Sequence, residues 1–197
     1  MAKSELSIAA QFQELDYQLA ITKCCFRLYQ TIALDTSELN RTDHNNFAQY
    51  FGSFHRVNAA IFAQATFIQL YKFFDQHHKA IKIDQIIKSI QNEFERKAIQ
   101  RKYDSLFSGH EKIIIKLRHK TYAHTDKYNS PDDLFQDIKT SYTDLKMIIN
   151  VLEDIMHDIS RSLNIVRMPN NPDEKIVQSE QLDMIKLVAQ AKSHNHG

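Results

Sequence analysis

Residues 112–126 contain the side chains of this chain that are best suited to chemistry on a charged substrate. Arg118, His119 and His124 lie within this stretch. Three lysines repeat in it at every fourth position: Lys112, Lys116 and Lys120. Histidine exchanges protons near neutral pH, and an arginine guanidinium binds carboxylate or phosphate through paired hydrogen bonds. Any chemistry that this chain performs is therefore expected to centre on Arg118 and His124.

The spacing of the stretch predicts a helix with two different faces. The three lysines form one basic stripe, and a second stripe is typical of a core-facing surface: Ile114, Leu117, Thr121 and His124. On an ideal helix Arg118 and His124 are about 9 Å apart along the axis and about 120° apart around it. One continuous helix therefore does not bring them together, and their convergence requires a helix end near Ala123 or a two-fold dimer interface.

The same residues resemble a known family motif. Arg118 and His119, followed by four residues and then His124, resemble the motif of the HEPN superfamily, in which an Arg and a polar residue precede a His. The longer string, Arg-His-Lys-Thr-Tyr-Ala-His-Thr-Asp over 118–126, is most similar to the abortive-infection, AbiU-like branch of that superfamily. Asp75, which follows Leu70, resembles the helix end of that branch, in which a leucine shortly precedes an aspartate.

This resemblance implies a metal-independent ribonuclease in phage defence or stress response, acting as a homodimer with its cleft on the two-fold axis. His124 would be the general acid and base, and Arg118 would bind the phosphate. The supporting residues would be His119, Lys120, Asp126 and Asp75, and the RNA backbone would follow Lys112 and Lys116. No cofactor or metal is expected. The alternative is a non-catalytic HEPN dimer that binds or regulates a partner.

An antitoxin or another regulatory protein is a further expected partner. Some toxins of the superfamily carry a tyrosine two residues after the motif histidine, which a partner nucleotidyltransferase modifies. This chain has Asp126 at that position, with Tyr122 and Tyr128 nearby. The sequence therefore does not carry the usual acceptor for that form of control.

Structural roles explain some of the same residues. His124 could be a core histidine that donates to a backbone carbonyl, and Arg118 could form an ion pair with Asp75 or Asp126. The lysine stripe is also typical of a solvated helix face. The structural and functional roles of Arg118 are compatible, because a carboxylate often orients a working arginine.

The elements that position these residues are expected to be helices, in an all-α, up-down bundle of four to five helices. With only three Gly and three Pro, the chain has few turn residues and should consist of few, long elements. Apolar residues recur at steps of three and four in four regions: residues 6–33, 42 to about 77, 84 to about 126 with a break or kink at Ser108–Gly109, and 130–163. The bundle is expected to span residues 1–166, and residues 167–197 are expected to form a tail with a short amphipathic helix.

Composition indicates a cytoplasmic protein with no membrane segment. Lys and Arg number 25 against 24 Asp and Glu, so the whole chain has no strong attraction for nucleic acid or anionic lipid. Its two cysteines, Cys24 and Cys25, are adjacent and are poorly placed to bridge each other. The apolar region 59–74 contains Gln64, Gln69 and Lys72, which make it too polar to span a bilayer.

Overall fold

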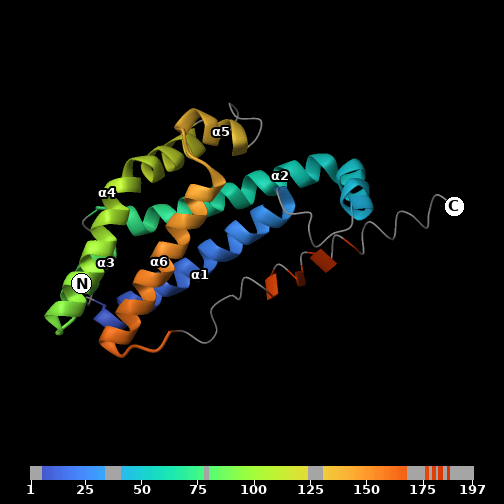
Figure 1. Cartoon of the computed structure of the whole chain (residues 1–197). Helices are drawn as coiled ribbons and strands as arrows, with labels where there is room; N and C mark the ends of the chain where they lie inside the picture. Colours follow the sequence, from blue (N-terminus) through green and yellow to red (C-terminus); the bar gives the residue numbers. More distant parts are fainter. Residues whose placement is uncertain are drawn as a thin grey trace, which may run out of the picture.

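The computed structural model describes residues 6–33, 41–77, 80–123 and 131–167, together with 176–177, 179–180, 182–183 and 186; within these helices, the side chains of 33, 41–56, 121–123 and 131–133 are not described. The described residues are all-α, as predicted, and contain no strand (Figure 1). The helices are α1 Ile8–Ala33, α2 Arg41–Phe74, α3 Ile83–Lys88, α4 Glu93–Ala123, α5 Pro131–Ile138 and α6 Tyr142–Leu163. None of them combines the length and apolar character that crossing a membrane requires.

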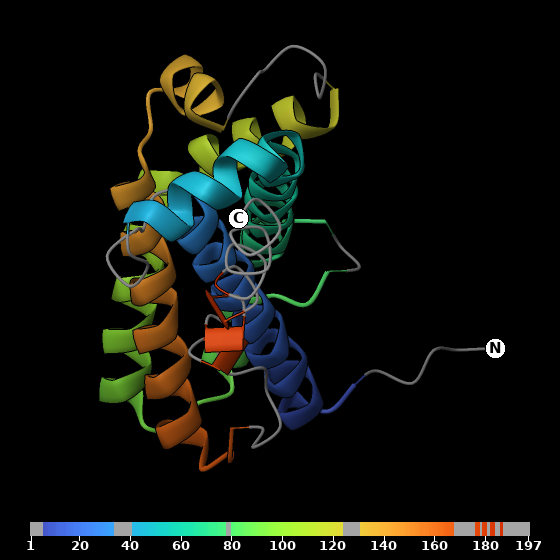
Figure 2. The ribbon, with the colours of Figure 1, turned by 90° about the vertical axis from the view of Figure 1, so that its right-hand side faces the viewer.

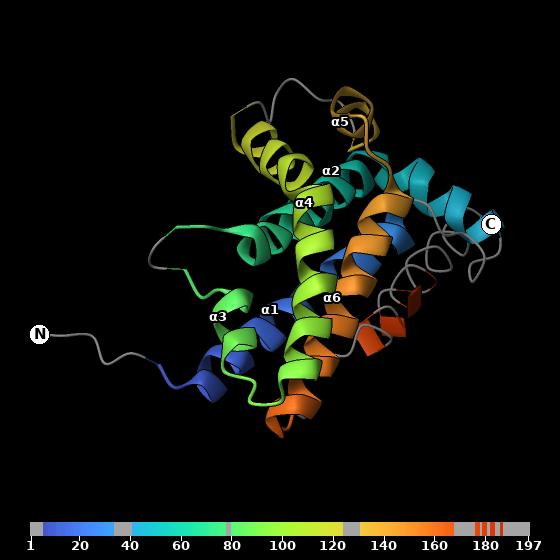
Figure 3. The same cartoon turned by 60° about the vertical axis from the view of Figure 1, so that its left-hand side comes forward.

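Four long helices pack side by side around one core (Figures 2 and 3). In the ring that they form, α1 packs on α2, α2 on α4, α4 on α6, and α6 on α1. The short helix α3 packs on α4 and α1, and α5 packs on α4 and α2. Consequently the α2–α4 pair and the α1–α6 pair lie on opposite edges of the bundle.

The buried face of α1 is the one that its sequence pattern predicts. Phe12, Leu19 and Tyr29 are almost completely buried, together with Leu15 and Phe26. The polar Thr22 lies on the same face, and its hydroxyl donates to the carbonyl of Gln18 over 2.7 Å. The buried Thr22 hydroxyl is therefore paired, so its burial on this face leaves no unsatisfied donor.

The predicted helix from Asp84 to the Ser108–Gly109 position is instead two helices, α3 and α4. At the end of α3, the Ser89 hydroxyl donates to the carbonyl of Ile86 over 2.7 Å. Asn92 then begins α4, since its side-chain oxygen accepts from the backbone N–H groups of Phe94 and Glu95 at 3.1 and 3.2 Å. These side-chain bonds satisfy backbone groups at the two helix ends and so favour a break at residues 89–92.

Ser108 and Gly109 lie inside α4, which is continuous from Glu93 to Ala123 and changes direction along its length (Figure 3). The Ser108 hydroxyl donates to the carbonyl of Ser105 over 3.3 Å, and Nδ1 of His110 lies 3.1 Å from the carbonyl oxygen of Leu106. Such contacts between side chains and the preceding turn bend helices. The pair therefore does not break the helix, and the kink that it predicts is consistent with the bend.

The last predicted helix also consists of two, because the chain turns between α5 and α6. Lys139 has a positive φ of 60°, and Ser141 and Asp144 form a reciprocal cap at the start of α6. The backbone N–H of Asp144 donates to Ser141 Oγ over 3.1 Å, and the N–H of Ser141 donates to the Asp144 carboxylate over 2.8 Å. Pro131 begins α5, one residue after the start of the predicted region 130–163.

Candidate functional site

Arg118 lies where α4 crosses α2. Its guanidinium carbon is 4.1 Å from the centre of the Tyr71 ring, which is the geometry of a cation–π contact. Both side chains are half-buried, so the contact is only partly exposed to water. On the inner side of α4, Ile114 and Leu117 are completely buried, as their stripe predicts. Their burial fixes the rotation of α4 and so places Arg118 on the Tyr71 ring.

Asp75 is connected to Arg118 through Tyr71, which contacts both residues. It follows the last residue of α2, and its Oδ1 accepts from the Tyr71 hydroxyl over 3.4 Å and from the backbone N–H of His77 over 2.9 Å. Asp75 therefore belongs to the surroundings of Arg118 by way of the tyrosine. A direct ion pair between Arg118 and Asp75 stays a prediction.

Tyr71 is a site residue that sequence analysis missed. Its ring holds the guanidinium, and its hydroxyl faces the aspartate four residues later in the chain. A signal was present, because Tyr71 and Asp75 have the i, i+4 spacing that places two side chains on one helix face. That spacing does not tell which neighbouring helix supplies the cation.

Of the other predicted site residues on α4, three are exposed to solvent and one forms an ion pair with another helix. Lys112, Lys116 and His119 are exposed. Lys120 forms an ion pair with Asp137 of α5, and its side chain is only 30% exposed. The three lysines of the stripe therefore differ in their surroundings. Lys120 connects the end of α4 to α5, whereas Lys112 and Lys116 are exposed to solvent.

The comparison with family models decides the family of this chain. The family model of AbiU2, a HEPN family, matches residues 6–178. The chain belongs to the AbiU2 family. This membership confirms the resemblance that residues 118–126 and Asp75 indicated, and it supports an abortive-infection-related HEPN domain. Searches of curated proteins and of solved structures gave no match.

His124 and Asp126, the remaining predicted site residues of this AbiU2 protein, lie outside the described residues. The described part of α4 ends at Ala123, directly before His124. Within the described part of the chain, no group of three His, Cys, Asp or Glu side chains is placed to hold a metal ion.

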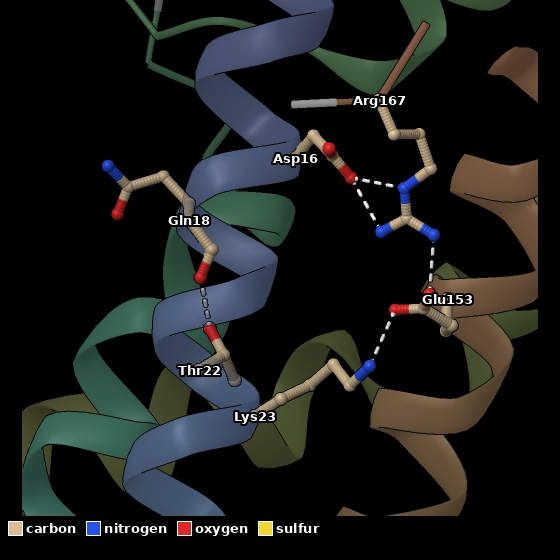
Figure 4. Close-up of polar contacts among 6 residues, drawn as sticks. All are labelled: Asp16, Gln18, Thr22, Lys23, Glu153 and Arg167. Atoms are coloured by element: carbon tan, nitrogen blue, oxygen red, sulfur yellow. Dashed lines mark hydrogen bonds and ion pairs between the residues drawn. The ribbon is translucent and has the colours of Figure 1, made fainter. Parts of the chain in front are cut away.

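A second polar centre of the AbiU2 chain joins α1, α6 and the segment after α6 (Figure 4). Nε and Nη2 of Arg167 contact Oδ1 of Asp16 at 2.7 and 2.6 Å, and Nη1 of Arg167 donates to Glu153. The other Glu153 oxygen lies 3.3 Å from Lys23 Nζ. Asp16 is completely buried, whereas the side chain of Arg167 is 29% exposed. We call these four residues the charge cluster.

The charge cluster changes the acid–base properties of its members. Burial alone would raise the pKa of Glu153, but the hydrogen bond from Arg167 and the charge of Lys23 outweigh it and lower that pKa. For Arg167, burial acts to lower the pKa, and the bonds to Glu153 and Asp16 raise it on balance. Sequence analysis missed this cluster, and it assigned Arg167 to the tail.

Proposed function

We propose that this AbiU2-family protein is a metal-independent endoribonuclease that acts as a homodimer, with Arg118 and His124 at a cleft on the two-fold axis. The observation that carries the proposal is the placement of Arg118, a motif residue, as a cation held on the Tyr71 ring at the edge of the bundle. The Tyr71 ring covers one face of the Arg118 guanidinium, and a guanidinium stacked in this way can still bind an anion through its N–H groups.

The chemistry is cleavage by the neighbouring 2′-hydroxyl of RNA. One His124 accepts the 2′-hydroxyl proton as the 2′ oxygen attacks phosphorus, and the bond from phosphorus to the 5′ oxygen breaks. The leaving 5′ oxygen takes a proton from the His124 imidazolium that forms in this way. Arg118 stabilises the charge that develops on the phosphoryl oxygens. The products are a 2′,3′-cyclic phosphate and a free 5′-hydroxyl.

The supporting roles follow from position. Lys112 and Lys116 are exposed on the same helix as Arg118 and would contact the RNA backbone, whereas His119 would supply a further polar contact. Asp75 would orient the site through Tyr71. Lys120 would act through its ion pair, which positions α5 beside the end of α4.

The decisive experiment compares purified wild type with His124→Ala and Arg118→Ala on RNA in the presence of EDTA. Loss of a general acid–base should lower the rate about a hundred- to ten-thousand-fold, and loss of Arg118 should cost a comparable factor. The cyclic phosphate end is checked by mass spectrometry. A Lys97→Ala variant is the matched control, because Lys97 pairs with Glu93 at the exposed start of α4.

Equal cleavage by all four proteins would identify a contaminating nuclease and end the catalytic proposal. No cleavage by any of them, with a dimer retained and RNA or a protein partner bound, would favour the non-catalytic alternative. Cleavage that EDTA abolishes would contradict the metal-independent mechanism.

A further inference from the structure

A groove whose charged side chains are mainly cationic lies between α1 and α6. Its cavity measures ≈ 240 Å³. The residues of α1 that line it are Lys23, Phe26, Arg27 and Gln30, and those of α6 are Lys146, Ile149, Asn150 and Glu153. The spacings of three and four on both helices show that each turns one face to the groove over two turns.

The floor of the groove is apolar and firmly packed. Phe26 and Ile149 are buried, and the Phe26 ring stacks on Tyr142 with the ring centres 4.7 Å apart. The reciprocal cap at Ser141 holds the start of α6, one turn before Lys146. The polar side chains therefore project from a rigid base, which favours binding because less freedom is lost when a ligand arrives.

The charge of the groove is positive although the whole chain is nearly neutral. Three cations line it, Lys23, Arg27 and Lys146, against one acid, Glu153. Both carboxylate oxygens of Glu153 are engaged, one by Arg167 and the other by Lys23. This leaves Glu153 little capacity to neutralise Lys146, which is exposed. Arg27 is positioned by its own helix, since its Nη1 donates to the Gln30 side-chain oxygen over 2.8 Å.

We propose that this groove binds a small phosphate monoester of about the size of a sugar phosphate. Arg27 and Lys146 would bind the phosphate, the Gln30 and Asn150 amides would bind hydroxyl groups, and the apolar floor would contact the carbon skeleton. The volume is below the roughly 300–1,000 Å³ of sites for drug-sized ligands, so a small ligand fits.

The groove is separate from the proposed cleavage site. It belongs to the α1–α6 edge of the helix ring, whereas Arg118 and Tyr71 belong to the α2–α4 edge on the opposite side. The proposal therefore does not depend on ribonuclease activity.

The test is an NMR titration of the ¹⁵N-labelled full chain with ribose 5-phosphate, and with ribose as the matched ligand that lacks the phosphate. We expect saturable shifts in backbone signals of residues 23–30 and 146–153 with ribose 5-phosphate, and none with ribose. Lys146→Gln removes an exposed cation and should weaken binding about three- to tenfold. Lys97→Gln, an equal loss of an exposed lysine at the start of α4, should leave the affinity unchanged.

Three results would overturn the proposal. The first is equal binding of ribose and ribose 5-phosphate, because the phosphate would then contribute nothing. The second is an equal loss of affinity in Lys146→Gln and Lys97→Gln, which would indicate unspecific attraction to positive charge. The third is a set of shifts around Tyr71 and Arg118, which would place the phosphate in the proposed cleavage site. Melting temperatures of both variants, expected to match wild type, show that the comparison is between folded proteins.

Discussion

At the scale of single residues, Tyr71 carries two contacts that the site needs. Its ring face holds the Arg118 guanidinium, and its hydroxyl meets the Asp75 carboxylate at the end of the same helix. Arg118 and Asp75 were predicted from a family resemblance, which recognises residue types in order along the chain. Tyr71 was not, because a cation–π contact depends on which faces of α2 and α4 meet.

Substitutions of Tyr71 separate its ring from its hydroxyl. Tyr71→Phe keeps the ring, so RNA cleavage should stay within about twofold of wild type, whereas Tyr71→Leu removes it and should lower kcat about fivefold. Tyr71→Trp gives an independent readout, because the chain contains no other tryptophan. The emission of Trp at position 71 should change on Arg118→Ala even if no RNA is cleaved. Identical spectra with and without Arg118 would contradict the contact.

The lowered pKa of Glu153 predicts a loss of stability at acid pH. Its folded-state pKa is lowered from an ordinary value of 4.5, so its contribution to stability is complete above that value and is lost as the pH falls through the lower, folded-state pKa. Wild type should exceed Glu153→Gln in denaturant stability at pH 7, and the difference should shrink below about pH 4.5. A difference that grows in acid would contradict the assigned sign.

At the scale of helices, the long amphipathic elements were predictable and their boundaries were not. The breaks at residues 89–92 and 139–141 are favoured by a few side-chain hydrogen bonds of Ser89, Asn92 and Ser141. The Ser141–Asp144 spacing resembles a capping box and could have been recognised.

The buried face of α2 was harder to predict. Spacings of three and four predict a buried stripe of α2 through Asn58, Phe62 and Ile68, but these side chains are only partly buried. Ala63, Phe67 and Leu70 are fully buried instead. A helix that is apolar around most of its surface has no single preferred face.

The turn between α5 and α6 offers a stabilising substitution. Lys139 has a φ of 60°, a left-handed conformation that costs a residue with a Cβ atom about 1–2 kcal/mol. After the entropy cost of glycine in the unfolded chain, Lys139→Gly should raise the free energy of unfolding by about 0.5–1 kcal/mol. Lys139→Ala is the control, because it shortens the side chain and keeps the strain. Thermal melts that rank Ala at or above Gly would count against a strained turn.

At the scale of the whole molecule, the all-α class and the family were predictable, whereas the order of helices in the ring was not. Periodicity gives each helix a buried face but does not give its neighbours. The charge cluster shows most clearly what sequence patterns do not predict. Asp16 and Arg167 are 151 residues apart, and the sequence around each residue does not indicate the other as its partner. Arg167 also lies just beyond the predicted bundle boundary at residue 166, although its side chain contacts α1 and α6.

A double-mutant cycle measures how far the charge cluster holds the bundle together. Arg167→Ala leaves the completely buried Asp16 carboxylate without its arginine and should cost about 3 kcal/mol of unfolding free energy. Asp16→Ala together with Arg167→Ala should cost at least about 1 kcal/mol less than the sum of the single losses. Urea denaturation of the four proteins provides the measurement. Additive losses would show that the two side chains do not interact in solution.

Mixing two inactive variants tests the proposed dimer. Wild type should scatter light as twice the 23.1 kDa chain at micromolar concentration. If Arg118 of one copy serves His124 of the other, co-refolded Arg118→Ala and His124→Ala should recover roughly a quarter of wild-type cleavage through mixed dimers. A dimer that stays inactive after mixing would place both groups of each site in the same copy, and a monomer would contradict the interface itself.

The separation of Asp16 and Arg167 along the chain also has a consequence for the time course of folding. Bringing residues 151 positions apart into contact requires closure of a very long loop, whose entropic cost is met only after the helices between them have assembled. The charge cluster should therefore form after the transition state. Interactions of this kind slow the loss of the native state and hardly alter the rate at which it is reached. The cluster would then form late in folding and lengthen the lifetime of the folded bundle by slowing its unfolding.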